Sequence, residues 1–279
     1  MSPPVSSPLV LRKSAPERFK TLVKNGLAAA GVDLRGWRGV VAVASPPDAQ
    51  RLADGEYVRM KRYAAETLRD YAALQRVKSA AEMRDTCEAA PLPLVERLLR
   101  ERSRHRRVVD IGAAYVKAES ALCAAIPDVT WDMLDLADNL AAENADVRTA
   151  NMEFVACYPL EFLERTANRY DVALFNRVLA VLPNGEVRSY LAALSSRARF
   201  IVFSEPGSVL RFVGNVNVDA IPPARSLPMR GRLFIHNYRG LLAEHGFTMR
   251  HYDAYRTPVS WHGEQHYLIQ GVAENTRDV

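Results

Sequence analysis

The spacing of hydrophobic residues changes character near residue 105. Before it, apolar positions recur with helical periodicity over 17–30 and 57–77, and again over the shorter segment 93–100. A short apolar run at 39–44 is consistent with an isolated strand. The first part of the chain therefore predicts a mainly helical segment.

After residue 105, short apolar runs alternate with segments of helical period. Strands are expected at 107–111, 130–136, 152–157, 171–175 and 199–204, with helices at 118–125, 137–144, 160–168 and 185–195 between them. A long irregular stretch, a helix at 237–245 and two strands at 247–255 and 266–273 complete the pattern. Such alternation is typical of an α/β doubly wound, mostly parallel sheet, here seven-stranded and Rossmann-like. The last two strands have no helix between them, so we expect them to pair antiparallel at one edge.

These patterns divide the chain into three parts. Residues 1–15 are rich in Pro and Ser, without the basic and apolar regions of a signal peptide, and are expected to be a disordered lead-in. Residues 16–104 are expected to form the helical segment, and residues 105–274 the α/β domain.

Composition and charge exclude several classes of protein. The 279 residues are 48% hydrophobic and 25% charged, and no apolar run approaches the ~20 residues of a membrane span. Three cysteines lie far apart with no CxxC pair, which favours a reducing, cytoplasmic location. The basic run at 99–107 is better explained as a solvated helix end than as an RNA or acidic-substrate patch, so nucleic acid is not an expected partner. The stretch WHGEQH (261–266) contains metal-ligand residue types, but Gly263 and the following strand argue against a helical metal motif, and no metal is expected.

The stretch VVDIGAAYVKAES (108–120) carries the most informative motif. It has the form of a nucleotide-binding strand and turn, with Asp110 in the strand and Gly112 where the strand ends. Ala114 and Val116 stand where such turns commonly have their second and third glycines. The motif therefore predicts either a cofactor site with altered chemistry or an ordinary strand end.

Five stretches in this order resemble the class I S-adenosylmethionine (SAM)-dependent methyltransferase superfamily, over roughly residues 106–273. They are VVDIG (108–112), WDMLDLA (131–137), YDVALFNRVLAVLP (170–183), FIVFSEP (200–206) and NYRGLLAEHGF (237–247). The resemblance implies that the chain uses SAM as its cofactor and methylates an acceptor. In relatives of this kind, N-terminal helices cover the acceptor site or build a homodimer.

The resemblance also implies a set of cofactor-binding residues. Asp110, Gly112, Ala113 and Ala114 would lie near the amino acid end of SAM. Asp135, followed by Leu136, would bind the ribose hydroxyls, because a carboxylate offers two acceptor oxygens. Tyr158 would either stack on adenine or belong to the core. Asn176 and Arg177, in the turn after the fourth strand, would face the cofactor pocket, or Arg177 would form an ion pair.

The acceptor is predicted less directly. Enzymes that methylate base amino groups usually have an Asn/Asp-Pro-Pro-aromatic turn after the fourth strand, and the Asn-Arg-Val-Leu sequence at 176–179 counts against that reaction. His236, in FIHNY (234–238), is a candidate catalytic base for a hydroxyl acceptor, or else a helix-capping or buried histidine. A loose similarity to bacterial small-molecule and sugar O-methyltransferases favours a hydroxyl on a small molecule.

Two alternatives remain open at this stage. The altered DIGAAY turn is also compatible with an enzyme of the same fold that uses SAM in another transfer or in a cyclisation. The missing glycines and the basic run are compatible with a non-catalytic methyltransferase-like binding subunit.

Overall fold

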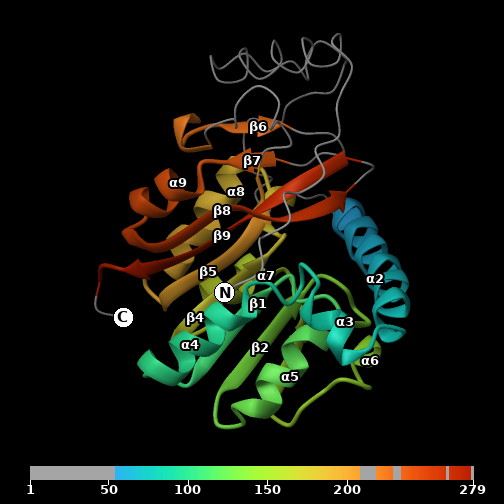
Figure 1. The fold of residues 1–279 in the computed structure, drawn as a ribbon. Helices are drawn as coiled ribbons and strands as arrows, with labels where there is room; N and C mark the ends of the chain where they lie inside the picture. Colours follow the sequence, from blue (N-terminus) through green and yellow to red (C-terminus); the bar gives the residue numbers. More distant parts are fainter. Residues whose placement is uncertain (1–53, 208–217, 229–233, 262–263, 278–279) are drawn as a thin grey trace, which may run out of the picture.

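A seven-stranded sheet forms the centre of the molecule, with the strand order β3-β2-β1-β4-β5-β9-β8 (Figure 1). The computed structural model describes residues 54–207, 218–228, 234–261 and 264–277. The expected lead-in, the helix at 17–30 and the apolar run at 39–44 lie outside the described residues.

The first five strands are parallel and begin close to the positions that the sequence predicts. They are β1 (Arg107–Ile111), β2 (Thr130–Asp135), β3 (Met152–Ala156), β4 (Tyr170–Asn176) and β5 (Ala198–Pro206). The last two, β8 (Phe247–Trp261) and β9 (Glu264–Asn275), pair antiparallel with each other, and β9 pairs antiparallel with β5. The predicted mixed edge of the sheet is therefore confirmed.

Helices cover both faces of this sheet (Figure 1). The helices α4 (Leu92–Arg102) and α5 (Lys117–Ala125) pack against one face, in a core that includes Val95, Leu122 and Trp131. The opposite face carries α7 (Pro159–Arg165), α8 (Asn184–Leu194) and α9 (Tyr238–Glu244). Both faces of the central strands are thus buried, which is why these strands read as nearly continuous apolar runs.

The described N-terminal part consists of α2 (Asp54–Arg76) and α3 (Ala80–Arg84). The helix α2 packs through Leu68 and Ala72 against Tyr115, in the turn after β1, and against Leu140 of α6 (Leu140–Glu143). The expected helix at 57–77 is confirmed. No helix in the described ranges is both long and apolar enough to cross a membrane.

The structure adds elements that the sequence pattern did not reveal. The strands β6 (Ser226–Pro228) and β7 (Phe234–His236) form a two-stranded antiparallel ribbon within the stretch expected to be irregular. A three-residue strand is too short for alternation to be visible. A short 3-10 helix, η3 (Leu179–Val181), follows β4 and interrupts what reads as one apolar run.

Candidate functional site

A cavity of about 50 Å³ lies at the carboxyl ends of β1 and β4. Its walls come from the turns after these two strands, from the first turn of α5, and from the N-terminal segment. The lining residues are Tyr71, Glu88, Asp110, Gly112, Ala113, Ala114, Tyr115, Glu119, Asn176 and Arg177. Six of the residues proposed from the sequence as cofactor ligands therefore meet around one cavity.

The turn after β1 keeps a left-handed backbone although one expected glycine is missing. Gly112 has φ 73° and Ala114 has φ 50°. For alanine this conformation costs about 1–2 kcal/mol. The buried Asn144 holds the turn in place, because its side chain accepts a hydrogen bond from Val116 N at 2.9 Å and donates one to Ala114 O at 2.9 Å. The side chain of Asn144, which lies well downstream in the sequence, therefore stabilises the conformation of this turn.

Gly112 is required by packing within the chain. A Cβ atom at this position would lie 2.6 Å from Val178 Cγ2, in the turn after β4. Together with the positive φ, this contact fixes glycine whether or not a cofactor is bound. The presence of glycine at position 112 is therefore not by itself evidence for a bound cofactor.

Asp135 ends β2 beside the same turn. Its carboxylate accepts hydrogen bonds from Ala137 N at 2.9 Å and Ala114 N at 3.2 Å. Burial raises the pKa of Asp135, whereas these backbone donors lower it. Each carboxylate oxygen has a second lone pair, so Asp135 can still accept hydrogen bonds from a ligand.

Two further carboxylates are buried at the cavity wall. Asp110 is 2% exposed and Glu119 is 5% exposed. Burial and the neighbouring Asp135 raise the pKa of Asp110 to about 7. Burial and the charge of Asp110 raise the pKa of Glu119 well above its usual range. Among the described residues, no side-chain cation lies within ion-pair distance of either group.

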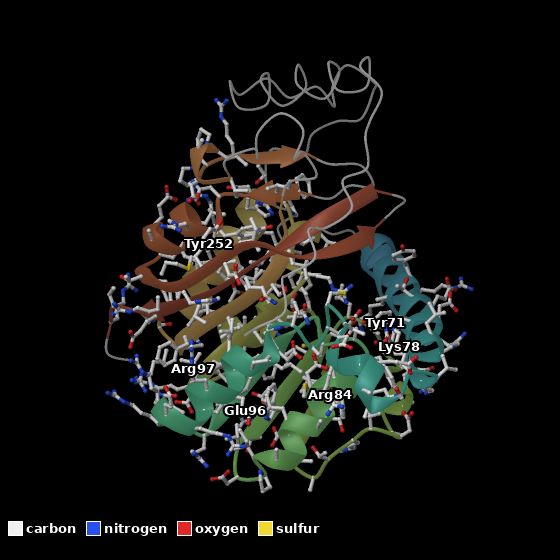
Figure 2. The ribbon with its side chains drawn as sticks, in the orientation of Figure 1. Tyr71, Lys78, Arg84, Glu96, Arg97 and Tyr252 are labelled. Carbon is white, nitrogen blue, oxygen red and sulfur yellow. The ribbon has the colours of Figure 1, made fainter. Side chains whose placement is uncertain are left out.

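Arg177 forms an ion pair with Glu88, one of the two alternatives that the sequence left open. Its Nη2 lies 2.9 Å from Glu88 Oε1 and 3.2 Å from the Tyr71 hydroxyl, which itself donates to Glu88 Oε1 at 2.6 Å. Burial would raise the pKa of Glu88, but the Arg177 charge and the Tyr71 hydrogen bond hold it at about 2. Tyr71 lies on the side of α2 that faces α3 (Figure 2). This cluster links the N-terminal segment to the turn after β4.

One polar atom of Asn176 and one of Arg177 have no partner among the described residues. Within the described ranges, Asn176 Oδ1 and Arg177 Nε are buried and make no hydrogen bond. Buried polar groups are nearly always paired, with protein, water or a ligand. Asn176 and Arg177, which both line the cavity, therefore carry one acceptor and one donor without a partner in the described part of the chain.

Two other predicted cofactor residues lie away from this cavity. Tyr158 and Leu136 belong to the core on the other face of the sheet, where the Tyr158 hydroxyl donates to Glu186. The contacts of Tyr158 favour the core alternative that the sequence left open.

His236, the predicted base, is the last residue of β7 and is fully buried against η3. Its Nε2 lies 2.9 Å from Leu179 O, and its Nδ1 lies 2.6 Å from Ser226 Oγ. Because Leu179 O can only accept, Nε2 carries the proton and Nδ1 accepts from the serine hydroxyl. Burial lowers the pKa of His236 to about 4. These contacts favour the buried, hydrogen-bonded alternative for His236.

Glu205, near the end of β5, binds the backbone of the turn after β4 and of η3. Its carboxylate accepts hydrogen bonds from Val178 N and Leu179 N at 2.9 Å and from Ala180 N at 3.1 Å. Glu205 and His236 therefore hold η3, and through it the turn that carries Asn176 and Arg177.

The sequence analysis did not identify Tyr71, Glu88, Glu119 or Asn144. Glu119 alone had a visible sequence feature, because it occupies the same helical face as Leu122 and Cys123, where an apolar residue is expected. Tyr71, Glu88 and Asn144 reach the site through tertiary packing, which no local pattern reports.

No profile of a known protein family and no curated protein matches the chain by sequence. Solved structures do match its fold. Magnesium protoporphyrin IX methyltransferase from Synechocystis PCC 6803, with S-adenosylhomocysteine (SAH) bound, superimposes with a TM-score of 0.53 at 16% identity, over 79% of this chain and 99% of that one. N-methyltransferase NodS from Bradyrhizobium japonicum WM9, also with SAH, gives 0.50 at 14% identity, over 77% and 99% of the two chains.

A putative O-methyltransferase from Nostoc punctiforme PCC 73102 gives a TM-score of 0.50 at 14% identity and covers 93% of this chain and 74% of its own. At these identities the likeness shows the fold alone. All three matches agree with the doubly wound α/β fold that the sequence pattern predicts.

Proposed function

Because the chain has the fold of the class I SAM-dependent methyltransferases, we propose that it binds SAM and transfers the methyl group to a small molecule. The observation that carries the proposal is the arrangement of Asp110, Asp135 and the left-handed turn between them, at the carboxyl ends of adjacent strands. In open α/β sheets, ligands bind outside the carboxyl ends of the strands.

The residues at this edge fit the polar groups of SAM. The amino acid end carries an ammonium and a carboxylate, for which the cavity wall offers the Asp110 carboxylate, Asn176 Oδ1 and Arg177 Nε. The ribose carries two hydroxyl donors, for which Asp135 retains lone pairs. A cavity of about 50 Å³ is too small for the whole cofactor. We therefore place only the amino acid end of SAM inside the cavity and the adenosine outside it, next to Asp135 at the end of β2. Entry of the amino acid end then requires movement of the residues that line the cavity.

The chain contributes mainly position and electrostatics to such a reaction. SAM supplies the activated methyl group, so the protein needs to hold the cofactor and the acceptor in line and to keep water away. The ion-paired cluster of Tyr71, Glu88 and Arg177 closes the cavity on the side of α2. Hydrogen bonds of Leu179 with Glu205 and His236 hold the turn after β4 in place. We expect the acceptor to approach at this edge of the sheet.

We propose a hydroxyl as the acceptor group, because the sequence loosely resembles bacterial small-molecule and sugar O-methyltransferases and the turn after β4 lacks the Asn/Asp-Pro-Pro-aromatic sequence of enzymes that methylate base amino groups. The solved neighbours are titled as N-methyl, putative O-methyl and magnesium protoporphyrin IX methyltransferases, so their likeness does not select among acceptors. With both ring nitrogens bonded inside the protein, His236 is better placed as a positioning residue than as the base.

Calorimetric titration of the full chain with SAM and with SAH tests the proposal. We expect saturable binding of both ligands at one site per chain. Transfer of radiolabel from methyl-labelled SAM into a panel of phenols, sugars and amines then tests the acceptor class. Absence of binding to both ligands would refute the cofactor assignment, and label appearing only in amines would refute the hydroxyl acceptor.

A further inference from the structure

Glu119 stands out because it has no place in the turn motif and yet faces the cavity. We propose that Glu119 and Asp110 together form the binding site for the ammonium of the cofactor's amino acid end. The inference rests on the proposed SAM-binding function and adds to it a second carboxylate, from the first turn of α5.

Burial of Glu119 in its ionised form is unfavourable unless a ligand compensates for it. Its neighbours on the helix face, Ala118, Leu122 and Cys123, belong to the apolar core under the sheet. An ionised carboxylate in such surroundings carries a large desolvation cost unless it is paired. Within the described ranges, Glu119 has no cation within ion-pair distance, and a hydrogen bond from its own backbone N–H lowers the pKa only in part.

The charges around the cavity do not balance. Three carboxylates line it, from Glu88, Asp110 and Glu119, together with one arginine. That arginine, Arg177, is already paired with Glu88 at 2.9 Å. Two carboxylates therefore remain, and Asp110 acts electrostatically on Glu119. A ligand group that satisfies both must carry positive charge and several donors, as a primary ammonium does.

The size of the cavity agrees with such a group. A volume of about 50 Å³ exceeds the ~10–15 Å³ that one water needs, so an ammonium on its carbon can enter. A metal ion fits less well, since no group of three or more histidine, cysteine or acidic residues in the described ranges is arranged to hold one. The second carboxylate also offers a reason why the turn works with fewer glycines: affinity for the amino acid end is supplied by charge from α5.

The test compares two ligands that differ only at this end. SAH carries the amino acid portion, whereas 5′-deoxy-5′-methylthioadenosine lacks it and keeps the adenosine and the sulfur. Both are titrated calorimetrically into the full chain and into Glu119→Gln, which keeps the shape of the side chain and removes its charge. Loss of a charge-assisted hydrogen bond predicts about 10-fold or greater weakening for SAH and a change within about 2-fold for the truncated ligand.

Glu186→Gln is the matched control. Glu186 is also 5% exposed and lies in the first turn of its helix, α8, but on the opposite face of the sheet. Its affinity for both ligands should equal that of the wild type, and melting curves confirm that each variant is folded. If Glu119→Gln binds SAH as the wild type does, or weakens both ligands equally, the ammonium site is refuted while the proposed function stands. If the wild type does not bind SAH, both fail together.

Discussion

At the scale of single residues, two positions in the turn after β1 show opposite kinds of constraint. Gly112 is fixed by a neighbour, since Val178 fills the space where a Cβ atom would lie. Ala114 has a left-handed backbone although it is not glycine, and hydrogen bonds with Asn144 and Asp135 hold it in this conformation. The departure from the glycine pattern is therefore tolerated where a hydrogen-bonded clamp supports the strained residue.

The strain at Ala114 predicts an unusual response to Ala114→Gly. An alanine-to-glycine change in a helix interior, as at the exposed Ala121 in α5, costs about 1 kcal/mol of unfolding free energy. At Ala114 the relief of about 1–2 kcal/mol of strain should cancel that loss or exceed it. Urea unfolding of the two variants measures the difference. Equal destabilisation of both would show that Ala114 is not strained.

Asp135 gives a prediction about cofactor affinity. Asp135→Asn keeps an acceptor for Ala137 N and removes the charge, so binding of SAM should weaken by about 10-fold or more, as charge-assisted hydrogen bonds to the ribose become neutral ones. Asp138→Asn is the control, because Asp138 is nearby and exposed and pairs with Lys61. Titration with SAM that gave the wild-type affinity for Asp135→Asn would remove Asp135 from the ribose site.

At the scale of elements, α2 is attached to the α/β domain through polar contacts as well as through the apolar packing of Leu68 and Ala72. Arg76 reaches Glu143 and Asp146 beside α6, Lys61 reaches Asp138, and Tyr71 joins Glu88 and Arg177 at the cavity. The exposed ion pairs each contribute little. The buried Tyr71 cluster is the contact expected to matter most, because an unpaired charge there would be costly.

Two tyrosines on α2 allow this to be measured. Tyr71→Phe removes the hydroxyl that bridges Glu88 and Arg177 and should lower the unfolding free energy by about 1–3 kcal/mol. Tyr63→Phe, at a side chain that is 71% exposed, should change it by less than about 0.5 kcal/mol. Thermal or urea unfolding compares them. If Tyr71→Phe leaves the free energy of unfolding unchanged, the Tyr71 hydroxyl does not anchor α2 at the cavity.

At the scale of the whole molecule, periodicity predicted the sheet and its antiparallel final pair because buried parallel strands and amphipathic helices leave regular patterns. It could not predict β6 and β7, whose three-residue length shows no alternation. The candidate site was predictable where it lies at strand ends and in the turns after them, as for Asp110, Gly112 and Asn176. Glu88 and Asn144 come to the site through packing of distant segments, and the burial of His236 depends on a ribbon that the sequence did not show.

The buried charges of the site also predict how the molecule responds to pH. Burial and the neighbouring Asp135 raise the folded-state pKa of Asp110 to about 7, and burial and the charge of Asp110 raise the folded-state pKa of Glu119 well above its usual range. A raised folded-state pKa means that the folded chain holds protons which the unfolded chain releases, so this part of the stability is complete below pH ~4 and is lost as the pH rises through 7. Glu205, whose pKa burial also raises to about 7, adds to the same loss but lies outside the cavity.

When an ammonium binds, the ionised forms of Asp110 and Glu119 gain a cation partner. For these two acids, a rise in pH then strengthens ligand binding instead of lowering stability. The increase in melting temperature caused by saturating SAH should therefore be larger at pH 8 than at pH 5, while the melting temperature without ligand should be lower at pH 8. The pair Glu88 and Arg177, which faces the same cavity, stays charged throughout this range, since the pKa of Glu88 is held at about 2. Asp110→Asn should remove much of the pH dependence of the ligand effect, whereas Glu186→Gln, which removes a buried carboxyl outside the cavity, should leave it unchanged. A ligand-induced shift that is equal at both pH values in the wild type would show that the buried acids do not take part in binding.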